Sequence, residues 1–194
     1  MAKGIEKCGW CVGNALYESY HDDEWGSPIY DDQRLFEFLL LEGAQAGLSW
    51  ITILKKREGY RKAFDGFEAE KVAQYRPARI NKLLLNPAIV RNRSKVESAV
   101  SNARLFLDIR ERKGSFSDYV WQFTDHQPKQ NYFRSTEQVP STTPVSEKMS
   151  KTMKKDGFRF VGSTICYAYM QATGMVNDHL VTCFRHEQCS RLSN

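Results

Sequence analysis

Cysteine and histidine side chains gather near both ends of the sequence. Cys8 and His21 lie near the start, while His179 and Cys183 lie four residues apart near the end and would share a face if that segment is helical. Two cysteines and two histidines form the ligand set of a closed, tetrahedral structural zinc site. The choice of ligands stays open, because further residues of these types lie nearby: Cys11, His186 and Cys189. Ordinary packing is the alternative, since a buried cysteine is a common small core residue.

Cys8 and Cys11 have the spacing of a thiol–disulfide redox motif, Cys8-Gly9-Trp10-Cys11. Such motifs lie on the strand-to-helix turn of a βαβ unit, and no strand pattern surrounds this one. A thiol oxidoreductase is therefore an alternative class, which predicts a lowered thiol pKa and no zinc. The odd number of cysteines, five, and the lack of an apolar leader in MAKGIEKCGW predict a reducing, cytoplasmic location.

A carboxylate stands among apolar residues in the segment 31–46. Glu42 shares a helical face with Leu35 and Leu39. A carboxylate there is costly unless it is paired or functional, although a structural ion pair or a helix end that reaches solvent would also explain it. Aromatic residues cluster nearby in sequence, and an aromatic cage beside a buried carboxylate suits a flat, cationic ligand. These residues are Trp10, Tyr17, Tyr20, Trp25 and Trp50.

The segment 144–174 predicts two helices joined by a short loop. Thr143-Pro144 supplies an N-cap and a first-turn proline for a helix over 144–156, which Gly157 would end. Gly162 would allow a tight turn into a second helix from Ser163. The free N–H groups at the start of that helix suit a phosphate, and basic residues surround them: Lys151, Lys154, Lys155 and Arg159. This layout is typical of a helix-hairpin-helix that grips the DNA backbone, although an ordinary αα-hairpin with solvated lysines fits equally.

Helical periodicity dominates the rest of the chain, which predicts an all-α fold. The segments 31–46 and 94–107 repeat apolar residues at helical spacing, and shorter helices are expected around Pro77. The segment 125–144 is the least periodic and predicts a long surface connection between two lobes, while the tail from about His186 is expected to fray. The composition, with 41% hydrophobic and 26% charged residues in 194, is that of a globular protein. The net charge of +5 mildly favours a nucleic-acid partner, and no apolar run is long enough for a transmembrane helix.

Five stretches of the sequence carry a family resemblance. They are Cys8-Gly9-Trp10, YHDDEWG at 20–26, LEGAQAGLSWITILKKRE at 41–58, VWQFTDHQP at 120–128 and KKDGFRFVGSTICYAYMQATGMVNDH at 154–179. They run in order across nearly the whole chain, and motifs of this length are specific. Together they resemble the bacterial 3-methyladenine DNA glycosylase I family.

The resemblance implies a helix-hairpin-helix DNA glycosylase fold. A single domain over 1–194 would have two helical lobes with a DNA cleft between them, and the hairpin would span about 144–174. One structural zinc ion per chain would join the segments 8–21 and 179–183, held by Cys8, His21, His179 and Cys183. Cys11, Cys166 and Cys189 would then have no part in the site.

The resemblance also implies a base pocket with Glu42 as its catalytic carboxylate. The pocket residues would be Trp10, Tyr17, Tyr20 and Trp50. A loop of Gln45, Ala46, Gly47 and Leu48 would fill the gap left in the DNA stack, so the helix should end before Ala46. The implied contacts to the DNA backbone are Lys154, Lys155, Gly162 and Thr164.

The implied reaction is base excision repair, in which N3-methylated adenine is flipped out of alkylated duplex DNA and its N-glycosidic bond is hydrolysed. The methyl group makes the base cationic, so it leaves as a neutral molecule without prior protonation, unlike the leaving group of an ordinary glycosidase. Asn177 stands where many members of the wider superfamily carry an aspartate, and the lysine of bifunctional members is also missing, so no lyase step is expected. The expected partners are alkylated double-stranded DNA and the 3-methyladenine base, with no membrane, and the default state is a monomer.

A catalytically silent protein that recognises bent or damaged DNA is a further alternative, because it would use the same hairpin and zinc clamp. Glu42 argues against it, since a buried acid that faces polyanionic DNA only weakens non-specific binding. Release of a free base discriminates between the two classes.

Overall fold

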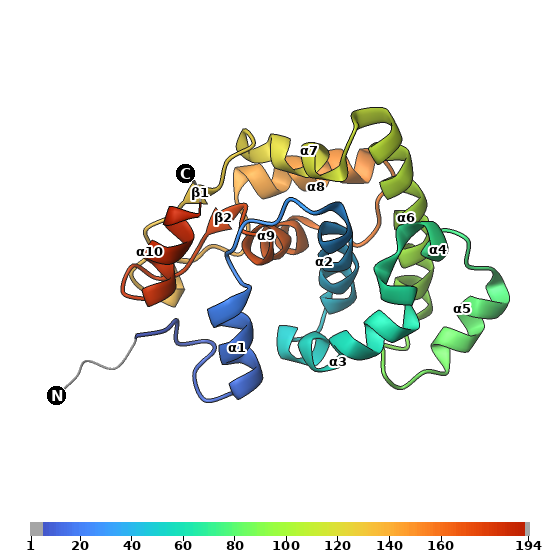
Figure 1. The fold of residues 1–194 in the computed structure, drawn as a ribbon, viewed down its shortest axis with the longest axis horizontal. Helices are drawn as coiled ribbons and strands as arrows, with labels where there is room; N and C mark the ends of the chain where they lie inside the picture. Colours follow the sequence, from blue (N-terminus) through green and yellow to red (C-terminus); the bar gives the residue numbers. More distant parts are fainter. Residues whose placement is uncertain (1–5, 193–194) are drawn as a thin grey trace.

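Helices make up nearly all regular structure in the computed structural model, which describes residues 6–192 (Figure 1). The longer helices are α1 (Ala15–Asp23), α2 (Asp32–Gln45), α3 (Trp50–Ala63), α5 (Pro77–Leu84), α6 (Arg93–Lys113), α8 (Pro144–Lys155), α9 (Ser163–Ala172) and α10 (Phe184–Arg191). The shorter ones are η1 (Asp65–Phe67), α4 (Ala69–Val72), α7 (Phe116–Trp121), η2 (Gln122–Thr124) and η3 (Thr136–Gln138). The prediction of a helical fold is confirmed, with one small exception: β1 (Lys129–Gln130) and β2 (Val176–Asn177) pair in parallel. None of the helices in this part of the chain is long and apolar enough to cross a membrane.

Helix α2 lies in the middle of the molecule beside α9 (Figure 1). Every residue from Leu35 to Ala44 is buried, which is the pattern of a helix covered on all sides. Its last carbonyls are satisfied from α6, because Lys95 Nζ donates to the oxygens of Ala44 and Ala46 at 2.7 and 2.6 Å. The helix ends at Gln45, as the family resemblance implies. Lys95 thus fixes the end of α2 that carries Glu42.

Helices α8 and α9 form the expected hairpin. Thr143 caps α8 in a reciprocal capping box with Ser146, and Pro144 occupies the first turn. Gly157 follows the helix with a left-handed φ of +101°. The predicted need for glycine at position 162 is wrong, because Gly162 has a φ of −61° that any residue can adopt. Phe160 takes the left-handed conformation instead, with a φ of +58°.

Contacts from α6 hold the hairpin loop in this conformation. Asn102 Nδ2 donates to the carbonyl oxygen of Arg159 at 3.0 Å, and Arg159 N donates to Asn102 Oδ1 at 2.9 Å. The Arg159 side chain reaches Ser94 Oγ, also on α6, at 2.9 Å. One helix therefore supports both the end of α2 and the loop of the hairpin.

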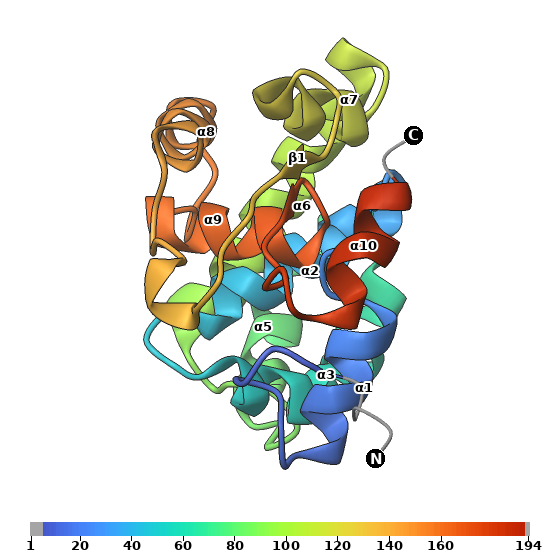
Figure 2. The ribbon, with the colours of Figure 1, turned by 90° about the vertical axis from the view of Figure 1, so that its left-hand side faces the viewer.

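The segment 125–144 runs over the surface as expected, since each of its residues is exposed or half-buried, and it also contains β1 and η3 and contributes Thr136 and Val139 to the lining of a cavity. One expectation about the second half of the chain is wrong. The tail does not fray from His186, because α10 extends to Arg191 and His186 Nε2 donates to the carbonyl oxygen of Asn131 at 2.7 Å. In both views α10 lies on the same side of the molecule as α1, although the two come from opposite ends of the chain (Figures 1 and 2).

Gly174, which leads from α9 into β2, has no room for a side chain. Its φ is +68°, and an added Cβ would overlap the backbone of Ser27 and Pro28. We expect Gly174→Ala to lower the free energy of unfolding by about 3 kcal/mol or more, as measured by urea denaturation. Gly13→Ala is the matched control, because Gly13 has a φ of +86° but open space around it, and it should cost about 1 kcal/mol. Equal losses in the two variants would contradict the close approach at Gly174.

Candidate functional site

A cavity of about 390 Å³ lies where α1, α2, α3 and α9 meet the segments after β1 and β2. One part of its wall is aromatic and consists of Trp10, Tyr17, Tyr20, Trp25 and Trp50. The polar side chains Glu42, Gln45, Gln171 and Asp178 also line it, as do Cys8, Thr136, Val139, Ala168 and Leu180. A concave, mostly apolar site with few polar groups is the usual form of a small-ligand pocket. The structure thus brings all five residues of the expected base pocket into one cavity.

Glu42 reaches this cavity from α2 as a buried carboxyl group. Glu42 is only 3% exposed, and its Oε2 has no hydrogen-bond partner among the described residues. Burial raises the pKa of Glu42 to about 8, because removal from water disfavours the charged form. An unpaired buried carboxyl group is costly, so its presence in a cavity indicates that a ligand completes its interactions.

Two further polar atoms of the cavity wall lack partners within the described part of the chain. They are Nε1 of Trp50, a donor, and Oε1 of Gln45, an acceptor. Together with Glu42 Oε2 they offer both donors and acceptors to a bound molecule. Gln45 was expected to contact DNA with its neighbours in the loop, and the structure places its side-chain oxygen in the wall of the cavity.

The aromatic side chains keep each other in place by edge contacts. Trp10 meets Tyr17 and Trp25 edge to face, with ring centroids 5.3 and 5.1 Å apart. Tyr20 and Trp50 lie 5.5 Å apart in a tilted arrangement. The Tyr17 hydroxyl accepts a hydrogen bond from the backbone N–H of Ile51 at 2.9 Å, which connects α1 to α3. The cage is therefore built before a ligand arrives.

The remaining residues expected to contact DNA lie on the surface. Gly47 and Leu48 are exposed in a tight turn that Leu48 N closes by donating to the carbonyl oxygen of Gln45 at 2.6 Å. Lys154 and Lys155 are exposed at the end of α8. Gly162 caps α9 and is half-buried, and Thr164 is exposed in the first turn of that helix.

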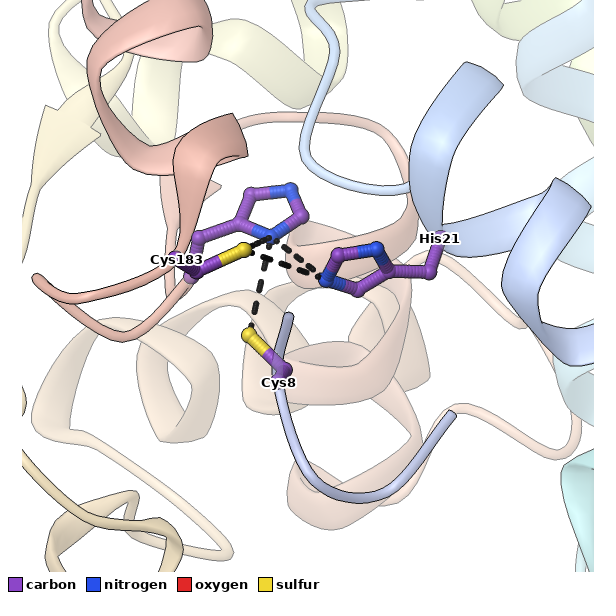
Figure 3. Close-up of side chains that lie close together, drawn as sticks. Cys8, His21 and Cys183 are labelled. Carbon is purple, nitrogen blue, oxygen red and sulfur yellow. Dashed lines mark hydrogen bonds between the residues drawn. The ribbon is translucent and has the colours of Figure 1, made fainter. Parts of the chain in front are cut away.

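A second feature of the site is a buried cluster of four metal-type side chains, formed by Cys8, His21, His179 and Cys183 (Figure 3). One potential ligand atom of each residue lies within 4.8 Å of all the others. His179 Nδ1 lies 3.2 Å from His21 Nε2 and 3.7 Å from the sulfur of Cys8. Cys183 Sγ lies 3.4 Å from His21 Nε2 and 3.7 Å from His179 Nδ1.

These distances fit a tetrahedral metal site. Ligand atoms placed 2.0–2.3 Å from a tetrahedral zinc ion are about 3.3–3.8 Å from each other. The outer nitrogen of each ring is occupied by an oxygen: His21 Nδ1 lies 2.8 Å from Asp22 Oδ1, and His179 Nε2 lies 2.9 Å from the carbonyl oxygen of Trp25. Such outer contacts fix the tautomer and turn the other nitrogen toward the metal position. The cluster can therefore hold a metal ion with four protein ligands.

One of the two thiols is held in the form that suits a metal ligand, whereas the hydrogen bond with Cys183 and burial raise the pKa of Cys8. The hydrogen bond from Cys8 lowers the pKa of Cys183 first, and contacts from His179 and His21 lower it further. Cys183 is thus held as a thiolate, the form that binds metal. His179 and Cys183 do not share a helix face, because these residues lie in a turn before α10, where Leu180 N donates to Cys8 Sγ at 3.4 Å. This turn, and not a shared helix face, brings the side chains of His179 and Cys183 into the cluster.

Cys11 lies outside the cluster, beside Cys8. Its thiol donates to the carbonyl oxygen of Cys8 at 3.1 Å, and burial raises the pKa of Cys11 to about 11. A redox motif requires a lowered thiol pKa on a strand-to-helix turn, and the Cys8–Cys11 segment consists of turns. The geometry disfavours the thiol oxidoreductase.

Sequence reasoning missed two polar residues of the cavity, Gln171 and Asp178. Gln171 Nε2 donates to Asp178 Oδ2 at 2.8 Å, and both residues face the cavity from α9 and the segment after β2. The position of Asp178 directly before the metal-type residue His179 could have marked it as a candidate site residue. Its hydrogen-bond partners come from segments distant in the sequence, so its place in the cavity could not be predicted. Trp25 belongs to the expected aromatic cluster and also lines the cavity.

Comparisons with known proteins find relatives over most of the chain. The sequence profile of the methyladenine glycosylase family matches residues 10–186. DNA-3-methyladenine glycosylase 1 of Escherichia coli is 46% identical over 179 residues, which cover 92% of this chain and 96% of the relative. A crystal structure of 3-methyladenine DNA glycosylase I superposes with a TM-score of 0.90 at 47% identity, covering 92% of this chain and 98% of the other. A second crystal structure of such an enzyme, in complex with 3-methyladenine, has a TM-score of 0.89 at 37% identity and covers 92% of this chain and 96% of its own. The chain belongs to the methyladenine glycosylase family.

Proposed function

We propose that the protein excises 3-methyladenine from alkylated duplex DNA and that the flipped base binds in the cavity beside Glu42. The reaction is hydrolysis of the N-glycosidic bond, the first step of base excision repair. The observation that carries the proposal is the buried, unpaired carboxyl group of Glu42 inside an aromatic cage. The solved relative in complex with 3-methyladenine supports the identity of the base.

Glu42 and the aromatic cage recognise the charge and the shape of the damaged base. The Glu42 carboxylate accepts hydrogen bonds from the adenine edge and attracts its positive charge, which is a strong interaction in a site that excludes water. Trp10, Tyr17, Tyr20 and Trp50 stack on the ring or meet its edge, and cation–π attraction contributes up to about 2 kcal/mol when the cation is desolvated. Normal adenine is neutral, so it gains neither the attraction to the Glu42 carboxylate nor the cation–π attraction. Discrimination therefore comes from charge as well as shape.

The α8–α9 hairpin holds the DNA backbone in this proposal. Lys154 and Lys155 attract phosphates, and the backbone N–H groups from Gly162 to Thr164 at the start of α9 bind a phosphate oxygen. The exposed turn of Gly47 and Leu48 fills the gap left in the DNA stack. These contacts offset the few kcal/mol that base flipping costs.

The four-residue cluster holds one zinc ion with a structural role. Cys8, His21, His179 and Cys183 occupy all four tetrahedral positions, so a zinc ion bound there has no position left for water or substrate. Its contribution is to join the start of the chain to the turn before α10. No lysine is among the described residues that line the cavity, which supports a monofunctional enzyme without a lyase step.

The pH dependence of excision tests the role of Glu42. Because the pKa of Glu42 is about 8 in the free protein, the ionised fraction that attracts the cationic base grows as the pH rises toward 8. We expect kcat/KM for release of 3-methyladenine to rise about tenfold per pH unit below this pKa and to level off above it. In Glu42→Gln, this rise of kcat/KM with pH should disappear. A profile that is flat from pH 6 to 8 in the wild type would remove Glu42 from recognition of the charged base.

A further inference from the structure

Lys95, in the first turn of α6, binds the chain at the point where α2 ends. Its Nζ donates to the carbonyl oxygens of Ala44 at 2.7 Å and of Ala46 at 2.6 Å. The lysine backbone is itself fixed, because the side chain of Asn92 caps α6 by accepting from the N–H of Lys95 at 3.1 Å. The ammonium group is therefore held in place by a well-ordered helix start.

The segment that Lys95 binds is a β-turn of residues 45–48. Leu48 N donates to the carbonyl oxygen of Gln45 at 2.6 Å, which closes the turn. Ala46 has φ −44° and ψ 116°, and Gly47 has a φ of +76°, which are the angles of a type II turn. Type I and type II turns differ by a rotation of the central peptide, here the peptide between Ala46 and Gly47. Lys95 binds the oxygen of this peptide and so holds the turn in its type II form.

Lys95 carries its charge at this position without an acidic partner. None of the ion pairs formed within residues 6–192 includes it. The side chain is half-buried, and its partial removal from water lowers the pKa of Lys95. The bonds to the two carbonyl oxygens offset this cost, since hydrogen bonds from an ionised donor are stronger than neutral ones and the end of α2 carries partial negative charge.

The helix that carries Lys95 also holds the loop of the α8–α9 hairpin. Asn102 follows Lys95 by seven residues, which is about two helical turns and about 10 Å, so the two side chains leave α6 on the same side. Asn102 exchanges two hydrogen bonds with the backbone of Arg159, and Ser94 accepts one from its side chain. One helix thus sets the position of the turn 45–48 relative to the hairpin.

We propose that Lys95 is a positioning residue for base flipping, which locks the turn 45–48 in the form that enters the DNA stack. The inference rests on the proposed function, in which the hairpin binds the DNA backbone while Gly47 and Leu48 fill the gap left by the flipped base. A turn that is ordered in advance loses little conformational entropy when it enters the stack. A turn released from Lys95 populates other forms as well, so the flipped state becomes less populated. Lys95 does not line the base cavity, so it acts on flipping and not on recognition of the base.

Three single variants separate this role from a general effect on the fold. Lys95→Met removes the ammonium group but keeps an unbranched side chain. Lys56→Met is the matched control, because Lys56 is also half-buried and its Nζ donates to the carbonyl oxygen of Pro87 at 2.7 Å, outside both the turn and the cavity. Gly47→Ala disturbs the same turn without touching Lys95, because Gly47 has a positive φ and open space around it.

The test measures three quantities. They are the single-turnover rate of 3-methyladenine release from methylated duplex DNA at saturating protein, the Kd for free 3-methyladenine from tryptophan fluorescence, and the preference for a duplex with a tetrahydrofuran abasic-site analogue over the undamaged duplex. For Lys95→Met we expect a rate and a preference that are each about tenfold lower, with a Kd for the free base within about twofold of the wild type. Lys56→Met should match the wild type in all three.

Two results for Lys95→Met would overturn the proposal. One is a rate within about twofold of the wild type. The other is a rate and an affinity for the free base that fall by the same factor, because Lys95 would then act through the base cavity. A wild-type protein without any preference for the abasic duplex would also overturn it, since the turn would then not enter the gap.

The double variant Lys95→Met/Gly47→Ala tests whether both substitutions act through the turn. If they do, the second substitution adds little, and the double variant should be about as slow as the slower single variant. Losses of rate that multiply would show that Lys95 acts elsewhere and would overturn the proposal.

Lys95→Gln replaces Lys95→Met in this comparison if the methionine variant does not fold. Its amide can still donate to one of the two carbonyl oxygens, so we expect a rate about threefold lower and the same lack of additivity with Gly47→Ala. A wild-type rate in Lys95→Gln would overturn the proposal. A wild-type protein that releases no base would contradict the proposed function instead, and the preference for the abasic duplex would then still decide the role of Lys95.

Discussion

Cys183→Ser is expected to abolish metal binding by the four-residue cluster and to remove a large part of the stability of the fold. The cluster joins segments at opposite ends of the chain, and metal binding to such a site contributes directly to the free energy of folding. A loss of about 3 kcal/mol or more corresponds to a Tm about 10 °C lower for a chain of this size. Metal analysis of the purified protein and a thermal melt measure the two effects.

Cys166→Ser is the control for this substitution. Cys166 is equally buried, and its thiol donates to the carbonyl oxygen of Val161, a bond that a serine hydroxyl can also make. It should retain zinc and lose much less stability than Cys183→Ser. Wild-type protein purified without zinc, or equal shifts of Tm in the two variants, would count against the metal clamp.

Glu42→Gln is expected to separate activity from stability. The substitution preserves the shape of the side chain but removes the charge that attracts the cationic base in the proposed function, so the rate of 3-methyladenine release should fall about a hundredfold. The free energy of unfolding should stay the same or rise, because the wild-type carboxyl group is buried without a partner for Oε2. Single-turnover kinetics and urea denaturation measure the two quantities.

Glu37→Gln, on the same helix, should show the opposite behaviour. The Glu37 carboxylate receives hydrogen bonds from Arg57 at 2.6 Å and from Arg61 at 2.9 Å, so its loss leaves two guanidinium groups without this partner. We expect a less stable protein that excises the base at close to the wild-type rate once folded. If Glu42→Gln instead destabilised the fold and kept the rate, Glu42 would be a structural residue.

Local signals in the sequence predicted much of this molecule. Thr143-Pro144 marks the start of α8 because the capping box and the first-turn proline act within a few residues. The apolar spacing around Glu42 predicts its burial for the same reason, since a helix brings Leu35, Leu39 and Glu42 to one side. The family motifs then connected these local features to the ligand set of the metal cluster, which spacing alone left open.

The errors share a cause, which is contact between distant segments. Phe160 rather than Gly162 takes the left-handed conformation in a loop that Asn102 holds from another helix. His186 is fixed by hydrogen bonds with Asn131 and Asn177, so the tail is ordered where its composition predicts fraying. No local pattern contains these contacts.

The turn from His179 to Cys183 and the cavity carboxylate of Asp178 could not be predicted from the sequence for the same reason. The turn from His179 to Cys183 is shaped by the cluster with Cys8 and His21, and not by helix propensity. The surroundings of Asp178 come from β1, α9 and the cavity wall, so its position as a cavity carboxylate emerges only in three dimensions.

Base release from methylated duplex DNA tests the central claim most directly. Purified protein is incubated with DNA treated with a methylating agent, and the free bases and the strands are separated by chromatography and gel electrophoresis. The account predicts free 3-methyladenine, an abasic site without strand cleavage, and no release of adenine from untreated DNA. Intact binding to the methylated DNA without release of any base would contradict it and would favour a protein that recognises damaged DNA without repairing it.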